Sequence, residues 1–354
     1  MLFLVRDSGL LHERNRLMGG STYRDEDLTA RKQAIKSSGK DTFAYTADMR
    51  KATKTSDIKC HPNLAIDKKK IRESRDSATH PQSNALAVIF DVTGSMGTVP
   101  VELEVRLKDL MGYFLKKDYL PNVHILFGAV GDSKCDKVPL QIGEFEPGAE
   151  ELMDFFQRVY LEGLGGGNGG ESYPNAIYFM ARHTSIDTFE KRGKKGYLFL
   201  IGDELPHEPV SVDEIAALMG KAPFETDIPV EQIVKEAQEK YQVFYIIPRL
   251  TDNARDPRVW KRWRELLGNE FVVGMDKTEQ VCELIGTLVG VCEGKIDAEK
   301  ATENLRGKDF EAEYLGIAKA AFRKLAGINA TKVSAKDTPT SKSKKGNPKT
   351  SLKI

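Results

Sequence analysis

The chain has 354 residues, of which 40% are hydrophobic and 30% charged, and its formal net charge at pH 7 is +1. We expect one large domain with a substantial buried core and added segments at its ends. No apolar run reaches the roughly 18 residues that cross a bilayer, and residues 1–5 are too short for a secretory signal, so we expect a cytoplasmic protein without a membrane partner.

The two ends of the chain are basic. Residues 1–80 carry 17 Lys/Arg and 11 Asp/Glu, while residues 331–354 carry seven Lys and one Asp. Each end therefore has a net charge of +6 and the middle of the chain has −11. Basic ends can contact nucleic acid, but no aromatic interleaving or reading motif accompanies these, so we do not expect a nucleic-acid partner.

Residues 1–80 show no sustained hydrophobic period, because scattered apolar positions alternate irregularly with Lys, Asp and Thr. We interpret them as an irregular N-terminal extension, with one or two short strands that lie over the main sheet. The Lys/Ser/Thr/Pro-rich residues 331–354 lack the apolar surface needed for folding and are predicted to be a disordered basic tail.

The central stretch of the sequence is residues 86–97, in which an apolar run leads directly into Asp91. Such a run predicts a strand buried on both faces, as in a parallel sheet. Thr93 and Ser95 follow at alternate positions, at the carboxyl end of the strand, where open α/β sheets bind ligands. One carboxylate and two hydroxyls are hard oxygen ligands, which suit Mg²⁺, Mn²⁺ or Ca²⁺ better than zinc.

Helical and strand patterns alternate after this stretch as far as residue 290. In chain order we predict a helix at 103–114, strands at 124–130 and 138–142, helices at 152–159 and 176–180, a strand at 197–201, a helix after a capping box at Ser211 and Glu214, a helix at 233–237, a strand at 243–247, a helix at 259–267, a strand at 271–273 and a helix at 281–288. This alternation predicts an α/β fold over residues 81–295, with a doubly wound, mostly parallel sheet and helices on both faces. Residues 296–330 are predicted to be helical and to pack back on this domain.

At Asp91, Thr93 and Ser95 the chain resembles the von Willebrand factor A (vWA) family, in the intracellular form found in bacteria and phages. The metal-ion-dependent adhesion site of that family begins with Asp-x-Ser/Thr-x-Ser after the first sheet strand. The resemblance implies a vWA or Rossmann-like fold in which the two hydroxyls bind the metal directly and the acid acts through water.

The resemblance extends to two further loops. Asp203 follows the apolar run 197–201 and matches the acid of the family's third loop. The family normally supplies a threonine from a Gly-rich turn, but residues 165–171 contain none, and the matching position falls at Glu171, with Asn168 as the alternative. The implied metal ligands are therefore Asp91, Thr93, Ser95, Glu171 and Asp203.

Electrostatics gives an independent reason to expect a cation near Asp91 and Asp203. Two carboxylates about 4 Å apart repel by ~1 kcal/mol in water and by ~4 kcal/mol at an effective dielectric of 20. Such a pair needs raised pKa values or a bound divalent ion, and we expect the ion, Mg²⁺ in the first place.

The resemblance implies a protein without enzymatic activity that engages a protein partner through this site. Intracellular vWA proteins often work beside MoxR-type AAA+ ATPases, which makes such an ATPase a candidate partner. In an alternative interpretation the chain is a structural or assembly component of a phage particle or another large complex.

A second alternative is a Mg²⁺-dependent aspartyl phosphotransferase. Residues 91–95 are similar to the Asp-Lys-Thr-Gly-Thr motif of phosphorylated pump ATPases, in which the first Asp is the nucleophile. The sequence has Val92 where those pumps have Lys, and nothing near Asp203 reproduces their later metal-binding segment.

Three further residues have plain structural interpretations. Trp260 and Trp263 are spaced as core residues of one helix, although an exposed pair would make an interaction hot spot. His207 lies close to Asp203 in the sequence but has no Ser/His/Asp arrangement around it, so we interpret it as a surface or capping histidine.

Overall fold

The computed structural model describes residues 22–330 except 68, 97, 164–168 and 250. The strands are β1 (Arg72–Ser74), β2 (Asn84–Asp91), β3 (Val123–Val130), β4 (Leu140–Ile142), β5 (Thr184–Ile186), β6 (Gly196–Ile201), β7 (Tyr241–Pro248) and β8 (Val272–Met275). The helices are α2 (Asp25–Ser37), α3 (Ala44–Met49), α4 (Val99–Val105), α5 (Leu107–Met111), α6 (Ala149–Arg158), α7 (Tyr173–Arg182), α8 (Asp187–Glu190), α9 (Val212–Met219), α10 (Val230–Lys240), α11 (Pro257–Leu267), α12 (Val281–Cys292), α13 (Ala298–Arg306) and α14 (Ala312–Leu325).

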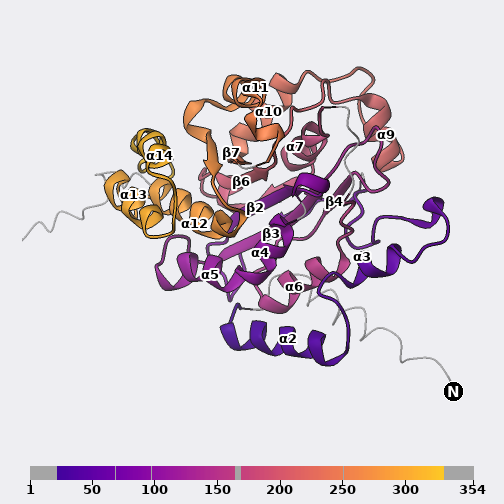
Figure 1. Cartoon of the computed structure of the whole chain (residues 1–354), viewed down its shortest axis with the longest axis horizontal. Helices are drawn as coiled ribbons and strands as arrows, with labels where there is room; N and C mark the ends of the chain where they lie inside the picture. Colours follow the sequence, from indigo (N-terminus) through magenta and orange to yellow (C-terminus); the bar gives the residue numbers. More distant parts are fainter. Residues whose placement is uncertain (1–21, 68, 97, 164–168, 250, 331–354) are drawn as a thin grey trace, which may run out of the picture.

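The main sheet has six strands in the order β4-β3-β2-β6-β7-β8 (Figure 1). All neighbouring strands are parallel except β3 and β4, which pair antiparallel. β1 and β5 form a separate parallel pair. The fold is therefore mixed α/β with a mostly parallel sheet, as the alternating pattern predicted.

Strand β2 shows why both faces of the sheet are covered. Successive side chains of a strand point to opposite faces. Leu86, Val88 and Phe90 belong to one hydrophobic cluster, whereas Ala87 and Ile89 belong to a second cluster on the other side. Burial on both faces explains the continuous apolar run in the sequence.

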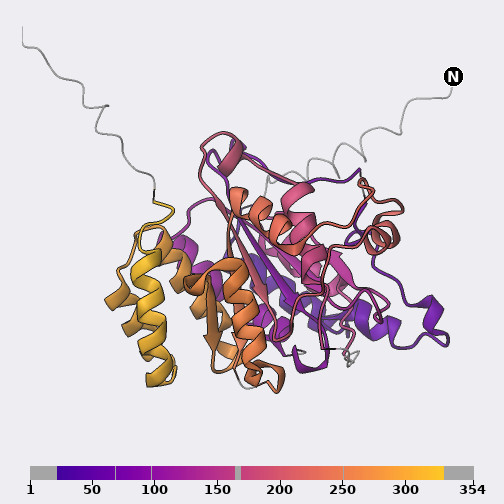
Figure 2. The ribbon, with the colours of Figure 1, turned by 90° about the horizontal axis from the view of Figure 1, so that it is seen from above.

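Different helices supply the two clusters. Apolar side chains of α4, α5, α6, α12 and α14 belong to the first cluster, and those of α7, α10 and α11 belong to the second. Figure 1 shows α7, α10 and α11 above the sheet and α4, α5 and α6 below it. Seen from above, in Figure 2, the C-terminal helices lie to one side of the sheet.

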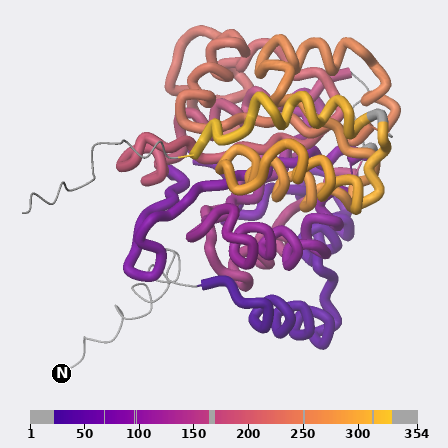
Figure 3. The backbone as a smooth tube through the Cα atoms, turned by 90° about the vertical axis from the view of Figure 1, so that its left-hand side faces the viewer, coloured from indigo at the N-terminus to yellow at the C-terminus, as the bar shows by residue number. Residues whose placement is uncertain are grey.

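The predicted C-terminal helical segment consists of α13 and α14. Figure 3 shows the two helices lying side by side along the domain. Phe322 and Leu325 of α14 are fully buried, so this segment shares the core of the main domain. The predicted tail, residues 331–354, lies outside the described residues.

The prediction of an irregular N-terminal extension is wrong for residues 25–49, which contain α2 and α3. Only Leu28 and Ile35 are buried in α2, and such a narrow apolar stripe gives little helical signal in the sequence. Three acidic residues in its first turn stabilise the helix through the macrodipole. The strand β1 agrees with the short strands predicted for this region, but it pairs with β5 and not with the main sheet.

The single helix predicted at 103–114 is also corrected. The structure has α4 and α5 separated at Arg106, followed by a π-helical turn over Gly112–Lys116. Within the described residues, no helix is both long enough and apolar enough to cross a bilayer.

Candidate functional site

The candidate site lies at the carboxyl edge of the sheet, where three loops meet. Asp91 is the last residue of β2, and Phe90 pairs with Ile201 at the end of β6, so the loop carrying Asp203 begins beside Asp91. Glu171 forms a bridge to the segment beyond Asp203. Its amide donates to Leu205 O at 2.9 Å, and its carbonyl accepts from the His207 amide at 2.9 Å.

Asp91 is fully buried and organises the first loop. Its Oδ1 accepts hydrogen bonds from the Thr93 amide at 2.7 Å and from the Thr93 hydroxyl at 2.6 Å. Its Oδ2 accepts from the Tyr173 hydroxyl at 2.8 Å. Because the Thr93 hydroxyl donates its proton to Asp91, the lone pairs of that oxygen stay available for a cation.

Tyr173, at the start of α7, is a site residue that the sequence did not indicate. A Cβ atom built on Gly202 would overlap the Tyr173 hydroxyl oxygen, so the absence of a side chain at 202 is what admits the phenol. The ring also packs edge-on against Tyr245 and Trp263. The third loop thus supports the hydrogen bond to Asp91 through a glycine that immediately precedes Asp203.

Burial and mutual repulsion make it unfavourable for several carboxylates of the site to be charged at the same time. Burial, with a contribution from the Asp203 carboxylate, raises the pKa of Asp91 in spite of its hydrogen bonds from Thr93 and Tyr173. Burial raises the pKa of Glu171 as well, with further contributions from Asp91 and Glu204. These mutual effects place the carboxylates of the three loops within electrostatic reach of one another.

A divalent cation fits this set of groups. Glu171 is 2% exposed, and its Oε2 is a buried oxygen with no hydrogen-bond partner in the described part of the chain. Among those residues no Lys, Arg or His forms an ion pair with Asp91 or Glu171. A carboxylate oxygen in that situation needs either a proton or a cation. Asp91, Thr93, Glu171 and Asp203 are the residues that would hold the ion, which would neutralise the carboxylates.

Histidine, cysteine and acidic side chains alone do not make a metal centre here. Within residues 22–330, apart from the gaps given above, no group of three or more His, Cys, Asp or Glu has the arrangement of a metal site. A cation at this edge would therefore depend on hydroxyl ligands such as Thr93.

Of the residues named in the sequence analysis, the structure brings Asp91, Thr93, Glu171 and Asp203 to one edge. Ser95 lies in a short 3₁₀ turn, Gly94–Met96, and its side chain is outside the described part of the structure. Asn168, the alternative to Glu171, also lies outside the described residues.

A second polar cluster adjoins the site at the end of β3. His207 Nε2 and Asp132 Oδ1 lie 2.9 Å apart, and the Cys135 thiol donates to Asp132 Oδ2 at 3.0 Å. Cys135 is exposed, but partial desolvation of its thiol and the neighbouring Asp132 raise its pKa to about 12, which leaves it a protonated thiol and a poor nucleophile. His207 is thus a largely buried partner of Asp132, with a side chain 10% exposed, whereas the sequence predicted a surface or capping histidine.

Comparisons with known proteins add little to this geometry. No protein family and no curated protein matches the sequence. Among solved structures, the pilus adhesin SpaC from Lactobacillus rhamnosus GG in its open conformation aligns with 62% of this chain at 9% identity and a TM-score of 0.40. A second SpaC structure aligns with 63% of the chain at 9% identity and a TM-score of 0.41. The aligned part spans about a third of the adhesin, 31% and 32% respectively.

Proposed function

We propose that this protein is a vWA-type module with a doubly wound sheet, and that it binds a divalent cation, Mg²⁺ in the first place, at the carboxyl edge of that sheet. The observation that carries the proposal is the pair of buried carboxylates, Asp91 and Glu171, which have no basic partner in the described residues. A divalent ion is the simplest species that satisfies both groups and the Thr93 hydroxyl together.

The function proposed for the bound ion is recognition of another protein in the cytoplasm. An acidic side chain of the partner would complete the coordination of the metal, and the surrounding loops would set specificity. A MoxR-type AAA+ ATPase is the partner class suggested by the vWA resemblance.

Hydrogen bonding at Asp91 favours this binding function over phosphoryl transfer. A nucleophilic carboxylate must present a free oxygen to the substrate. Asp91 is fully buried, its Oδ1 accepts two hydrogen bonds from Thr93, and its Oδ2 accepts one from Tyr173. Attack by Asp91 would require at least one of these bonds to break.

Calorimetric titration with Mg²⁺ tests the metal site directly. Wild type should bind one ion, and Glu171→Gln should bind at least tenfold more weakly, because the amide keeps the shape of the side chain but not its charge. Asp252→Asn is the matched control, since its side chain is 98% exposed, and it should bind as wild type does. Equal binding by wild type and Glu171→Gln would refute the site.

Affinity capture tests the recognition function. Tagged wild type in Mg²⁺ should retain a partner that is lost in EDTA and lost with Asp91→Asn. Retention of the same proteins under all three conditions would refute metal-dependent recognition.

A further inference from the structure

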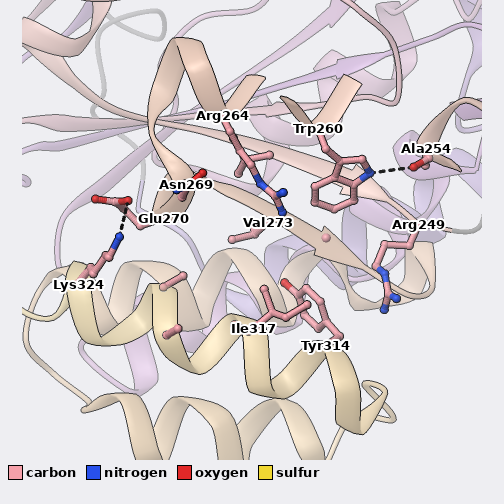
Figure 4. A pocket seen from close by; sticks show the side chains of 15 residues that line it. Arg249, Ala254, Trp260, Arg264, Asn269, Glu270, Val273, Tyr314, Ile317 and Lys324 are labelled. Carbon is pink, nitrogen blue, oxygen red and sulfur yellow. Dashed lines mark hydrogen bonds and ion pairs between the residues drawn. The ribbon is translucent and has the colours of Figure 1, made fainter. Parts of the chain in front are cut away.

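A second candidate site lies at the opposite margin of the sheet from β4. A cavity of about 620 Å³ opens between α11, the edge strand β8 and α14 (Figure 4). This volume is in the range of small-molecule sites, ~300–1,000 Å³. The stretch of α14 from Tyr314 to Lys324 lines one side, which at 1.5 Å per residue makes the hollow about 15 Å long.

The walls of the cavity are largely apolar and aromatic. The Trp260 indole N–H donates to Ala254 O at 2.8 Å, so its polar atom is satisfied and the ring is free for apolar contact. Tyr314 and Ile317 project from α14 across the hollow from Trp260 (Figure 4). Ile317 is 58% exposed, which is a high exposure for a large aliphatic side chain in this chain. The hollow thus leaves unburied an apolar surface that a ligand could cover.

The charges around the cavity leave one cation without a counter-ion. Arg249 pairs with Asp276 at 2.5 Å, and Lys324 lies 3.5 Å from Glu270. Arg264 has no ion pair or side-chain hydrogen bond among the described residues, and its guanidinium lies 5.1 Å from the centre of the Trp260 ring. Figure 4 shows this guanidinium pointing into the hollow beside Trp260.

We infer that this cavity binds an elongated apolar molecule that carries a single carboxylate, such as a medium-chain fatty acid. The carboxylate pairs with Arg264, whose planar guanidinium matches its two oxygens. The apolar body lies along α14, over Ile317 and the small side chain of Ala321, and covers the ring of Trp260. The paired Arg249 and Lys324 mark the two ends of the hollow and contribute no net charge to it.

Tryptophan fluorescence reports on this site, because the chain has two tryptophans and they differ in exposure. Trp263 is fully buried, whereas Trp260 lines the cavity. Titration with decanoate should change the emission of wild type to saturation. Decanol, which has the same chain without the charge, should bind at least tenfold more weakly. The emission change should disappear in Trp260→Phe.

Two cavity variants separate the charge from the shape. Arg264→Gln should weaken decanoate about tenfold and leave decanol unchanged, while Ala321→Phe should abolish binding of both by filling the hollow. Arg258→Gln is the matched control on the same helix, since Arg258 is 78% exposed and paired with Asp256, and it should bind as wild type does. Thermal melts of all variants verify that each is folded.

Three results would overturn the inference. One is no fluorescence change in wild type up to the solubility limit of decanoate. Another is equal decanoate affinity in wild type and folded Arg264→Gln. The third is tighter binding of a peptide with an apolar C-terminal residue, which would assign the cavity to a protein partner.

Discussion

Two groups of acidic side chains in the described part of the protein differ in the charges that surround them. Beside β4, a hollow of about 930 Å³ is lined by Glu144, Glu146, Glu150, Glu151 and Asp154. Arginines neutralise two of these acids, with Arg72 2.5 Å from Glu144 and both Arg31 and Arg158 in contact with Asp154 at 2.5 and 2.8 Å. At the carboxyl edge, Asp91 and Glu171 have no such basic partner among the described residues.

The difference separates structural acids from candidate functional ones. A carboxylate paired with arginine is neutralised within the chain, and removing the arginine destabilises the fold because it leaves the carboxylate uncompensated. Buried carboxylates that raise one another's pKa have no basic side chain to neutralise them. Their charge must instead be neutralised by protons or by a bound cation.

Replacing Arg72 tests whether the fold depends on the arginines that pair with these acids. The Arg72 side chain is 2% exposed and also donates to Ile142 O at 2.9 Å, so Arg72→Met removes a buried cation from the partly exposed Glu144 and leaves a buried carbonyl unpaired. We expect a loss of about 4 kcal/mol in the free energy of unfolding, measured by urea denaturation. Arg182→Met, which breaks the more exposed pair with Glu236, should cost less than about 1 kcal/mol. Equal losses would remove the structural role given to Arg72.

Replacing Gly202 tests the support of Asp91 by Tyr173. Gly202→Ala puts a methyl group where the Tyr173 hydroxyl lies, which overpacks the site and breaks the hydrogen bond to Asp91. We expect a destabilisation of about 3 kcal/mol. Gly316→Ala in α14 is the control, because nothing lies within 4 Å of the added Cβ, and it should stabilise the protein by about 0.5–1 kcal/mol. A neutral result at Gly202 would show that Tyr173 is not needed at Asp91.

Adding Mg²⁺ tests whether the carboxylates at the carboxyl edge of the sheet bind a cation. At a concentration 100 times its Kd, an ion that binds only the folded state stabilises it by about 2.7 kcal/mol. Thermal unfolding should show this gain in wild type and in Asp252→Asn, but not in Glu171→Gln. The same gain in Glu171→Gln would place the ion elsewhere on the protein.

Glu146 lines the hollow beside β4 and has no arginine partner among the described residues. Replacing it tests the effect of an unpaired buried acid on stability. Its Oε2 is buried without a hydrogen-bond partner in the described chain, and burial, then Glu151, raises the pKa of Glu146 to about 9. The folded state therefore holds a proton that the unfolded state loses above its ordinary pKa of 4.5. The stability linked to this proton is present below pH 4.5 and is lost as the pH rises toward 9.

Glu146→Gln should remove this pH dependence. At pH 6, about 1.5 pH units above the ordinary pKa, we expect the variant to be more stable than wild type by about 2 kcal/mol. The two proteins should converge below pH 4.5. Denaturation at several pH values checks this, and parallel curves would mean that the pKa of Glu146 is not raised.

Much of the sheet could be predicted because its strands are buried on both faces. The apolar runs of β2 and β6 have few other interpretations, and each ends in an acid. Since carboxyl ends of parallel strands share one edge, the meeting of Asp91 with the loop of Asp203 followed from the strand pattern. Glu171 was placed by the vWA resemblance and not by its own local sequence.

Other features depend on contacts that the sequence does not encode locally. The hydroxyl of Ser211 accepts from the Asp213 amide, but Glu214 accepts from Asn175 of α7 and does not complete the predicted capping box. Tyr173 lies in a run of buried residues, so its sequence context is that of an ordinary core aromatic residue. Its role depends on Gly202, which is distant in the sequence and leaves space for the Tyr173 hydroxyl. Trp260 and Trp263 share one helix, yet the first lines a cavity and the second is core.

The two margins of the main sheet have a consequence for self-association. β4 is only three residues long, and the chain beyond it turns back so that Glu146 bridges to Ile125, while β8 has four residues and lies between α11 and α14. Long bare edge strands act as templates on which further chains add by backbone hydrogen bonding. Short, flanked margins oppose such growth, so concentrated solutions of this protein should resist fibril formation.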